Sequence, residues 1–220
     1  SKATESLSAV KELIQSTYNK NVVSKYGAFS GEFAFKNSLL LSSIDGVGTK
    51  SIFVKKWLTQ DHAFFNLGLD IVNHCINDIL VQGGEPLFFL DYFGAGTLNQ
   101  NELYNFIRGI VASCCQHNVV LMGGETAEMP DFYKQDISEL VGCIIGSKSS
   151  SLINVNTYWD KSDEYSVLAF PSDSPHTNGY SLIRKLELSR ENKCDNEIIN
   201  QMVIPHKCYL EDVNKIIKEY

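Results

Sequence analysis

A long helical pattern followed at once by a buried strand constrains the fold of this chain most. Residues 66–83 carry apolar side chains at helical spacing, at Val72, Cys75, Ile76, Ile79 and Leu80. This spacing predicts a helix with one stripe facing the core. Gly83-Gly84-Glu85-Pro86 ends that helix, and the apolar run 87–93 predicts a buried strand directly after it.

Further helices and strands alternate along the chain. The patterns predict helices at 4–18, 99–117 and 181–188, the second capped by Thr97, and strands at 39–45, 119–122, 140–146 and 167–170, with a Gly-rich aromatic loop at 26–31. The alternation predicts an α/β or α+β layer architecture. A polar stretch between Ser147 and Asp163 predicts a domain boundary, with one domain at 1–150 and a second that begins within 163–220.

Composition excludes several classes of partner. The chain has a net charge of −7 and no block of Lys and Arg, so we expect no nucleic acid partner. It contains no run of about 18 apolar residues and no signal-peptide pattern, so we expect no membrane partner and a cytoplasmic location. The six cysteines form no CxxC pair, and we expect them to be reduced and mostly buried.

An acid, two glycines and a lysine occur together in residues 45–50, at the end of the predicted strand 39–45. Glycine lets the backbone approach a ligand closely. Lys50 could contact phosphate oxygens, and Asp45 could bind the accompanying magnesium ion as a hard oxygen ligand. The spacing is not that of a P-loop, and a turn of this composition also joins the strands of many hairpins.

The polar side of helix 66–83 has no Lys, Arg or Glu. It carries Asp70, His74, Asn77 and Asp78 at positions i, i+4, i+7 and i+8. Because unpaired buried charge is costly, carboxylates without counter-charges indicate a cation supplied from outside. The alternative is a helix packed against a second sheet, with the aspartates capping neighbouring loops.

Three further residues are candidates for chemistry. Asp91 lies inside an apolar run and needs a partner, and Glu125 follows a Gly-Gly pair that indicates either a ligand approach or a structural turn. His176 lies in the loop before helix 181–188, whose N-terminus Thr177 or Asn178 could cap and where anions collect. His176 could therefore meet a phosphate or a reacting group, although a single loop histidine is more often a surface residue.

Four segments together resemble one enzyme family. They are SSIDGVGTK at 42–50, GLDIVNHCINDILVQGGEPLFFLDYF at 68–93, GGETAEMPDFY at 123–133 and SPHTNGYSLIRK at 174–185. In their order along the chain and in their residues, these segments resemble the phosphoribosylformylglycinamidine cyclo-ligases. The wider superfamily includes selenophosphate synthetase and thiamine-monophosphate kinase.

The resemblance implies ring closure of formylglycinamidine ribonucleotide to aminoimidazole ribonucleotide in purine biosynthesis, with ATP and Mg²⁺. It implies a two-domain fold in which the N-terminal mixed sheet, with flanking helices, pairs into a barrel across a homodimer. The implied metal ligands are Asp45, Asp70 and Asp78. The implied ATP contacts are Gly46, Val47, Gly48, Thr49, Lys50 and Asn178, and the implied catalytic residues are His176, Asp91 and Glu125.

The chain also departs from the family. It stops at Tyr220, so we expect the second domain to be incomplete. Asp173-Ser174 and Pro205-His206-Lys207 stand where the family usually has Ser-Gly and Pro-Thr-Arg. Two alternatives stay open: another ATP-using member of the superfamily with a different acceptor, and a non-catalytic nucleotide-binding dimer module.

Overall fold

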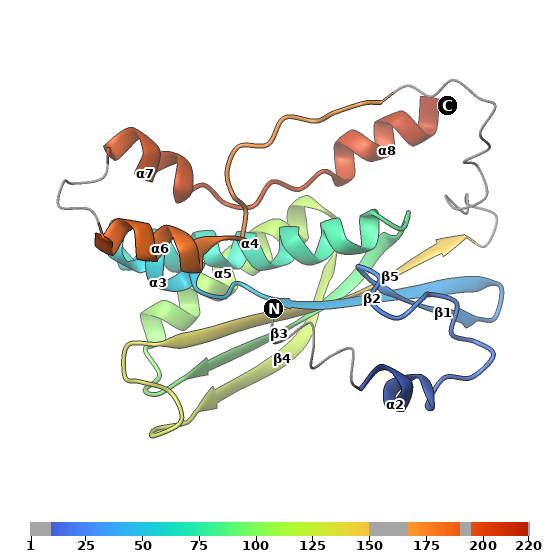
Figure 1. Ribbon diagram of the computed structural model, residues 1–220, viewed down its shortest axis with the longest axis horizontal. Coiled ribbons are helices and arrows are strands. Elements are labelled where there is room, and N and C mark those ends of the chain that lie inside the picture. Colours follow the sequence, from blue (N-terminus) through green and yellow to red (C-terminus); the bar gives the residue numbers. More distant parts are fainter. Residues whose placement is uncertain (1–9, 150–166, 190–194, 220) are drawn as a thin grey trace.

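The computed structural model describes residues 10–149, 167–189 and 195–219 (Figure 1). Its centre is a sheet of five strands: β1 (Gly31–Phe35), β2 (Ser38–Gly46), β3 (Glu85–Ala95), β4 (Val120–Glu128) and β5 (Ser138–Ser149). The strand order is β1-β2-β5-β3-β4. Strands β3 and β4 are parallel, and every other neighbouring pair is antiparallel. The predicted mixed sheet is therefore confirmed.

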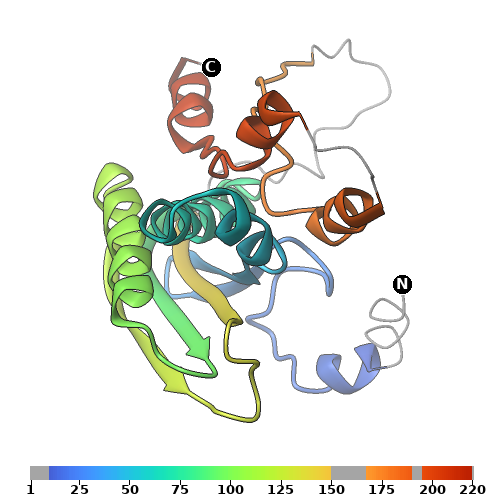
Figure 2. The same ribbon diagram turned by 90° about the vertical axis from the view of Figure 1, so that its left-hand side faces the viewer.

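Helices cover one face of this sheet (Figure 2). They are α3 (Lys50–Trp57), α4 (Gln60–Leu80) and α5 (Gln100–Gln116), and α5 connects the parallel strands β3 and β4. The core lies between the two layers, where Phe89 and Phe93 of β3 and Ile71 of α4 are fully buried. No helix of the described residues is long and apolar enough to cross a membrane.

Two glycines set the distance between α4 and α5. A Cβ on Gly68 would lie 2.7 Å from the Ile110 nitrogen, and one on Gly109 would lie 3.0 Å from the Gly68 Cα. Real Cβ atoms hardly ever come so close to backbone, so only glycine allows these helices to touch. This contact fixes the position of α4 on the sheet. It thereby also positions the polar side chains on the outer face of α4.

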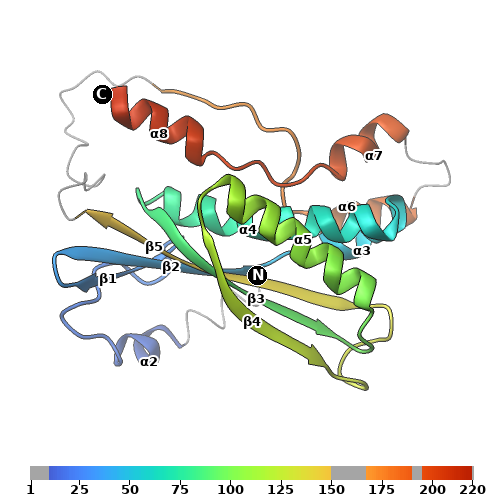
Figure 3. The same ribbon diagram turned by 180° about the vertical axis from the view of Figure 1, so that it is seen from behind.

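Three shorter helices lie on the side of α4 that faces away from the sheet (Figures 1 and 3). They are α6 (Tyr180–Ser189), α7 (Asn196–Met202) and α8 (Leu210–Glu219). The polar side of α4 binds the chain between α7 and α8, residues 203–209, which we call the docked segment. The bonds run from Asn66 Nδ2 to the Val203 oxygen at 3.3 Å, from Asn73 Nδ2 to the His206 oxygen at 2.7 Å, from Asn77 Nδ2 to the Lys207 oxygen at 2.7 Å, and from the Tyr209 amide to Asn77 Oδ1 at 3.0 Å.

The long, regular elements match their predictions. The strands expected at 39–45, 87–93 and 140–146 and the helices expected at 66–83, 99–117 and 181–188 are confirmed, with longer or shifted bounds. The predicted cap of α5 is wrong, because the Asn99 side chain, not Thr97, accepts the amides of Asn101 and Glu102. Helix 4–18 is described from residue 10 only and contains α2 (Lys11–Gln15). The five described cysteines are free thiols, of which Cys75 and Cys114 are buried.

One predicted strand and one of the two alternatives for the Gly123-Gly124 pair are wrong. The strand expected at 167–170 is absent from these described residues, which are exposed and pair with no strand. The Gly123-Gly124 pair is not a turn, since β4 continues through it beside a register shift against β3. The loop expected at 26–31 is confirmed for residues 26–30, and β1 begins at Gly31. Most of the predicted domain boundary lies outside the described residues.

Candidate functional site

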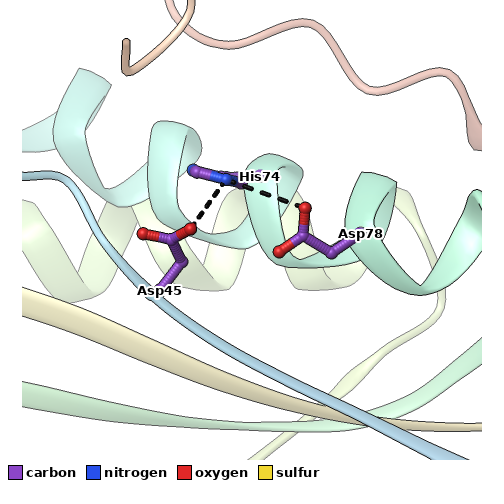
Figure 4. Close-up of side chains that lie close together, drawn as sticks. All are labelled: Asp45, His74 and Asp78. Carbon is purple, nitrogen blue, oxygen red and sulfur yellow. Dashed lines mark ion pairs between the residues drawn. The ribbon is translucent and has the colours of Figure 1, made fainter. Parts of the chain in front are cut away.

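Two aspartates and a histidine meet where β2 passes beneath α4 (Figure 4). Asp45 follows Leu41 and Ser43 on the helix-facing side of β2, because alternate strand residues share a face. His74 and Asp78 lie one turn apart on α4. His74 Nε2 is 3.0 Å from Asp45 Oδ2 and 3.7 Å from Asp78 Oδ1, and one ligand atom of each residue lies within 4.8 Å of the others.

Hydrogen bonds from outside hold these three side chains. The Ser43 hydroxyl donates to Asp78 Oδ2 at 2.7 Å, and the Gly46 amide donates to Asp45 Oδ1 at 2.6 Å. The Thr177 hydroxyl lies 2.8 Å from His74 Nδ1. The remaining atom of each ligand therefore points toward the middle of the group.

His74 partly offsets the negative charges of Asp45 and Asp78. Burial alone would lower the pKa of His74, but the hydrogen bond and charge of Asp45, with the charge of Asp78, raise it overall. The bond to His74 lowers the pKa of Asp45, whereas burial raises that of Asp78. Carboxylate oxygens and an imidazole nitrogen at these distances also fit one divalent metal ion.

Lys50 and Asp70 form a separate, fully buried ion pair. Lys50 Nζ lies 2.8 Å from Asp70 Oδ1 and 2.8 Å from the Ile204 oxygen, and Asp70 Oδ1 also accepts the His206 amide. Burial lowers the pKa of Lys50 and raises that of Asp70, while their attraction opposes both shifts. In this structure Lys50 thus contacts Asp70 rather than a phosphate, and Asp70 does not join the group around His74.

The glycine loop joins a strand to a helix rather than two strands of a hairpin. Val47 is buried and its amide bonds to the Leu140 oxygen, and Gly48 has a φ of 60°. The Thr49 hydroxyl lies 3.0 Å from that of Ser181, and α3 begins at Lys50. The loop therefore precedes a helix N-terminus, a position at which anions are favoured.

Two further histidine rings, those of His176 and His206, lie next to His74. His176 has a φ of 59°, a left-handed conformation that is uncommon for residues other than glycine. Its ring stacks on His206 with 4.0 Å between centroids, and the His206 ring lies 5.0 Å from that of His74. Burial, with the charges of His176 and His74, lowers the pKa of His206 to about 2. Asn178 is exposed in the turn before α6.

The two other predicted acids lie on opposite faces of the sheet. Asp91 pairs across the sheet with Gly142, which pairs with Asp45, so both aspartates face the helices with one strand between them. Their Cα atoms are therefore about 10 Å apart. Burial raises the pKa of Asp91. Glu125 is one residue past Gly124, the partner of Asp91 in β4, so it faces the open side, where it is exposed.

Sequence reasoning found part of this site. Asp45 and Asp78 were predicted as metal ligands, and the structure brings them together. His74 was placed on the correct helix side but not among the ligands, although its spacing of four residues from Asp78 is the available signal. His206 could be noticed only as a departure from the family pattern, because its contacts join residues more than 100 positions apart in the chain.

Comparisons with known proteins identify the relatives of the chain. The family described as AIR synthase related protein, N-terminal domain, matches residues 32–147. Phosphoribosylformylglycinamidine cyclo-ligase of Prochlorococcus marinus (strain AS9601) is 36% identical over 98% of this chain and 64% of its own length. The cyclo-ligase of Clostridium botulinum (strain Langeland) is 36% identical over 98% of this chain and 65% of its own length. The chain thus spans just under two thirds of these relatives.

A solved structure has the same fold. The crystal structure of a protein from Thermus thermophilus superposes with a TM-score of 0.50 and 17% identity, over 65% of this chain and 43% of that one. At this identity the likeness supports the arrangement of sheet and helices.

Proposed function

Because this chain belongs to the AIR synthase related protein family, we propose that its protein closes the imidazole ring of formylglycinamidine ribonucleotide. The reaction would consume ATP and give aminoimidazole ribonucleotide, ADP and phosphate, as a step of purine biosynthesis. The observation that carries this proposal is the similarity to cyclo-ligases along nearly the whole chain. The matched segments include the glycine loop and all three residues of the group around His74.

Each part of the site has a proposed role. Asp45 and Asp78 would hold the divalent metal ion that accompanies ATP, for which the family resemblance implies Mg²⁺, and this ion would neutralise phosphate charge. The amides of the loop from Gly46 to Thr49 would contact ATP phosphates next to the N-terminus of α3. Lys50 and Asp70 would reach phosphate or metal only after separating from each other, so in the described conformation they anchor the docked segment.

The chemistry would depend on positioning. A phosphoryl group passes from ATP to the formyl amide oxygen, an amidine nitrogen then bonds to the activated carbon, and the carbon–oxygen bond breaks to release phosphate. His176 stacks on His206 beside the site in a left-handed backbone conformation, and burial lowers its pKa, which favours the neutral ring. It would accept the proton that the attacking nitrogen loses. Asp91 would face the substrate from the side of the sheet that the helices cover.

The open face of the sheet supports pairing of two copies. On this face Ile44 is 70% exposed and Val120 is 57% exposed. Burial of such apolar side chains drives association. Glu125 would then lie within the dimer. Light scattering should give a dimer for the chain and a monomer for Ile44→Lys, and a monomeric wild-type chain would refute the pairing.

The decisive experiment measures aminoimidazole ribonucleotide and ADP together, in the 220-residue chain and in a full-length relative carrying the same substitutions. We expect Asp45→Asn and Asp78→Asn to abolish ATP turnover while leaving the thermal unfolding midpoint nearly unchanged. Glu12→Gln, an exposed acid of α2, is the matched control and should keep full activity. Full turnover in either aspartate variant would refute the roles proposed for these residues. ADP release that does not depend on formylglycinamidine ribonucleotide would indicate another acceptor.

A further inference from the structure

The side chain that gives this site its particular chemistry is His74. Its Nε2 lies 3.0 Å from Asp45 Oδ2 and 3.7 Å from Asp78 Oδ1. Two atoms bound about 2.1 Å from one ion are about 3.0 Å apart at a right angle and about 3.4 Å apart at the tetrahedral angle. The three atoms can therefore share one ion after a small side-chain movement.

Each of the three candidate ligands is oriented by a hydrogen bond to the polar atom that points away from the group. Thr177 bonds to Nδ1 of His74, Ser43 bonds to the second oxygen of Asp78, and the Gly46 amide bonds to the second oxygen of Asp45. Outer bonds of this kind orient metal ligands, and an Nδ1–H that donates to a hydroxyl leaves the Nε2 lone pair for an ion. These bonds come from outside the group, so they preorganise it.

Unpaired buried atoms beside His74 are a second, independent observation. Among the described residues, Asp70 Oδ2 and His206 Nδ1 are buried without a hydrogen-bond partner. Asp70 lies one helical turn before His74, and His206, only 5% exposed, has its ring 5.0 Å from that of His74. Folded proteins rarely leave such atoms unpaired. The buried ring of His206, next to that of His74, therefore carries one nitrogen that is available for a further partner.

We propose that Asp45, His74 and Asp78 bind a borderline divalent transition-metal ion, of the class of Co²⁺, Ni²⁺ and Zn²⁺, in preference to Mg²⁺. Imidazole is a favoured ligand of these ions, whereas Mg²⁺ takes oxygen ligands and keeps several waters. The Asp45 side chain is 44% exposed, so an ion can enter from solvent. This inference rests on the proposed function in one respect, because Asp45 and Asp78 are also the residues proposed to bind the metal ion that accompanies ATP.

Metal binding to the 220-residue chain, without ATP or substrate, tests this directly. The metal-free chain is titrated with Co²⁺ and with Mg²⁺ by calorimetry, in a Cys115→Ser background that removes an exposed thiol. We expect one Co²⁺ per chain, bound at least about tenfold more tightly than Mg²⁺. His74→Asn should weaken Co²⁺ about tenfold or more and change Mg²⁺ less than about twofold. His62→Asn, an exposed histidine of the same helix, should change neither.

A second readout needs no variant of the site. In NMR spectra of the chain with His74 intact, Co²⁺ should shift or broaden the His74 ring signals at lower concentration than those of His62. Equal Co²⁺ affinity in His74→Asn, or His74 signals that Co²⁺ leaves unchanged, overturns the proposal. This test is independent of the ring-closure assay described above. Co²⁺ binding through His74 together with no ring closure in that assay would refute the proposed function and leave the metal site standing.

Discussion

Lys50 donates to Asp70 at 2.8 Å inside the protein, with neither side chain exposed. A buried pair of this kind is costly to break, because the remaining charge is left without compensation. We expect Asp70→Asn to lower the free energy of unfolding by about 3–5 kcal/mol, measured by urea denaturation. The double variant Lys50→Met/Asp70→Leu should lose less than the sum of its two single variants.

An exposed ion pair provides the control for this prediction. Lys215 and Glu211 are 2.9 Å apart on α8, and both are exposed. Lys215→Met should leave the unfolding midpoint unchanged. Strict additivity of the Lys50 and Asp70 substitutions would mean that the buried pair contributes no coupling.

The contact between α4 and α5 predicts an unusual response to alanine. In an exposed helix, Gly→Ala stabilises by roughly 0.5–1 kcal/mol. At Gly109 the new Cβ would meet the backbone of α4. We therefore expect Gly109→Ala to destabilise by about 1–3 kcal/mol, with no loss for Gln116→Ala on the exposed end of α5. A Gly109→Ala protein as stable as the parent would contradict the close packing of the two helices.

The bonds from α4 to the docked segment predict local protection from hydrogen exchange. Asn77 accepts the Tyr209 amide and donates to the Lys207 oxygen. Asn77→Ala should make the Tyr209 amide exchange about tenfold faster or more, because a net bond of about 1.5 kcal/mol is lost. Amides of β5 should be unaffected. Unchanged exchange at Tyr209 would show that other contacts hold the segment.

Acid should weaken the contact between His117, which follows the last residue of α5, and Cys208 of the docked segment. Burial lowers the pKa of His117, and the charge of Glu211 only partly opposes this; Cys208 Sγ is 3.9 Å from its Nδ1. An unfolded histidine has a pKa of about 6.5. Between pH 7 and pH 5 the unfolded chain therefore binds this proton first, and stability falls as the pH falls.

Replacing His117 should remove that part of the pH dependence. The loss cannot exceed about 1.4 kcal/mol per pH unit, and the partly exposed ring gives less. His117→Gln should show a smaller drop in the urea midpoint between pH 7 and pH 5, whereas the exposed His62→Gln should not. An NMR titration that places the pKa of His117 above 6.5 would reverse the predicted sign.

Long segments with periodic apolar residues made most helices and strands of the sheet domain predictable. The helix at 66–83 and the strand at 87–93 carry enough apolar residues to identify them without tertiary information, and the resemblance to cyclo-ligases is confirmed by the comparisons. The strand β1 was missed because it is a short edge strand whose side chains are all at least partly exposed. An apolar run at 167–170 suggested a strand, but sequence does not show whether a pairing strand exists.

The site was predictable only in part, because its contacts join distant residues. The polar residues of α4 divide into two groups. Asp78 belongs to a candidate cation site, whereas Asp70 and Asn77 bind the main chain of the docked segment. No local pattern could identify Asp70 as the partner of Lys50, because a buried carboxylate and a phosphate are equally good partners for a lysine.

Most hydrogen bonds that α4 side chains form with the docked segment go to main-chain atoms, and an exception is Asn77 Nδ2, which lies 3.1 Å from His206 Nε2. Asn66, Asn73 and Asn77 contact carbonyl or amide groups, which every residue type supplies in nearly the same way. A substitution in residues 203–207 therefore leaves these main-chain bonds available, whereas the ring at position 206 is also held by Asn77 and His176. The attachment of the segment and the chemistry beside His74 thus depend on different atoms of this segment.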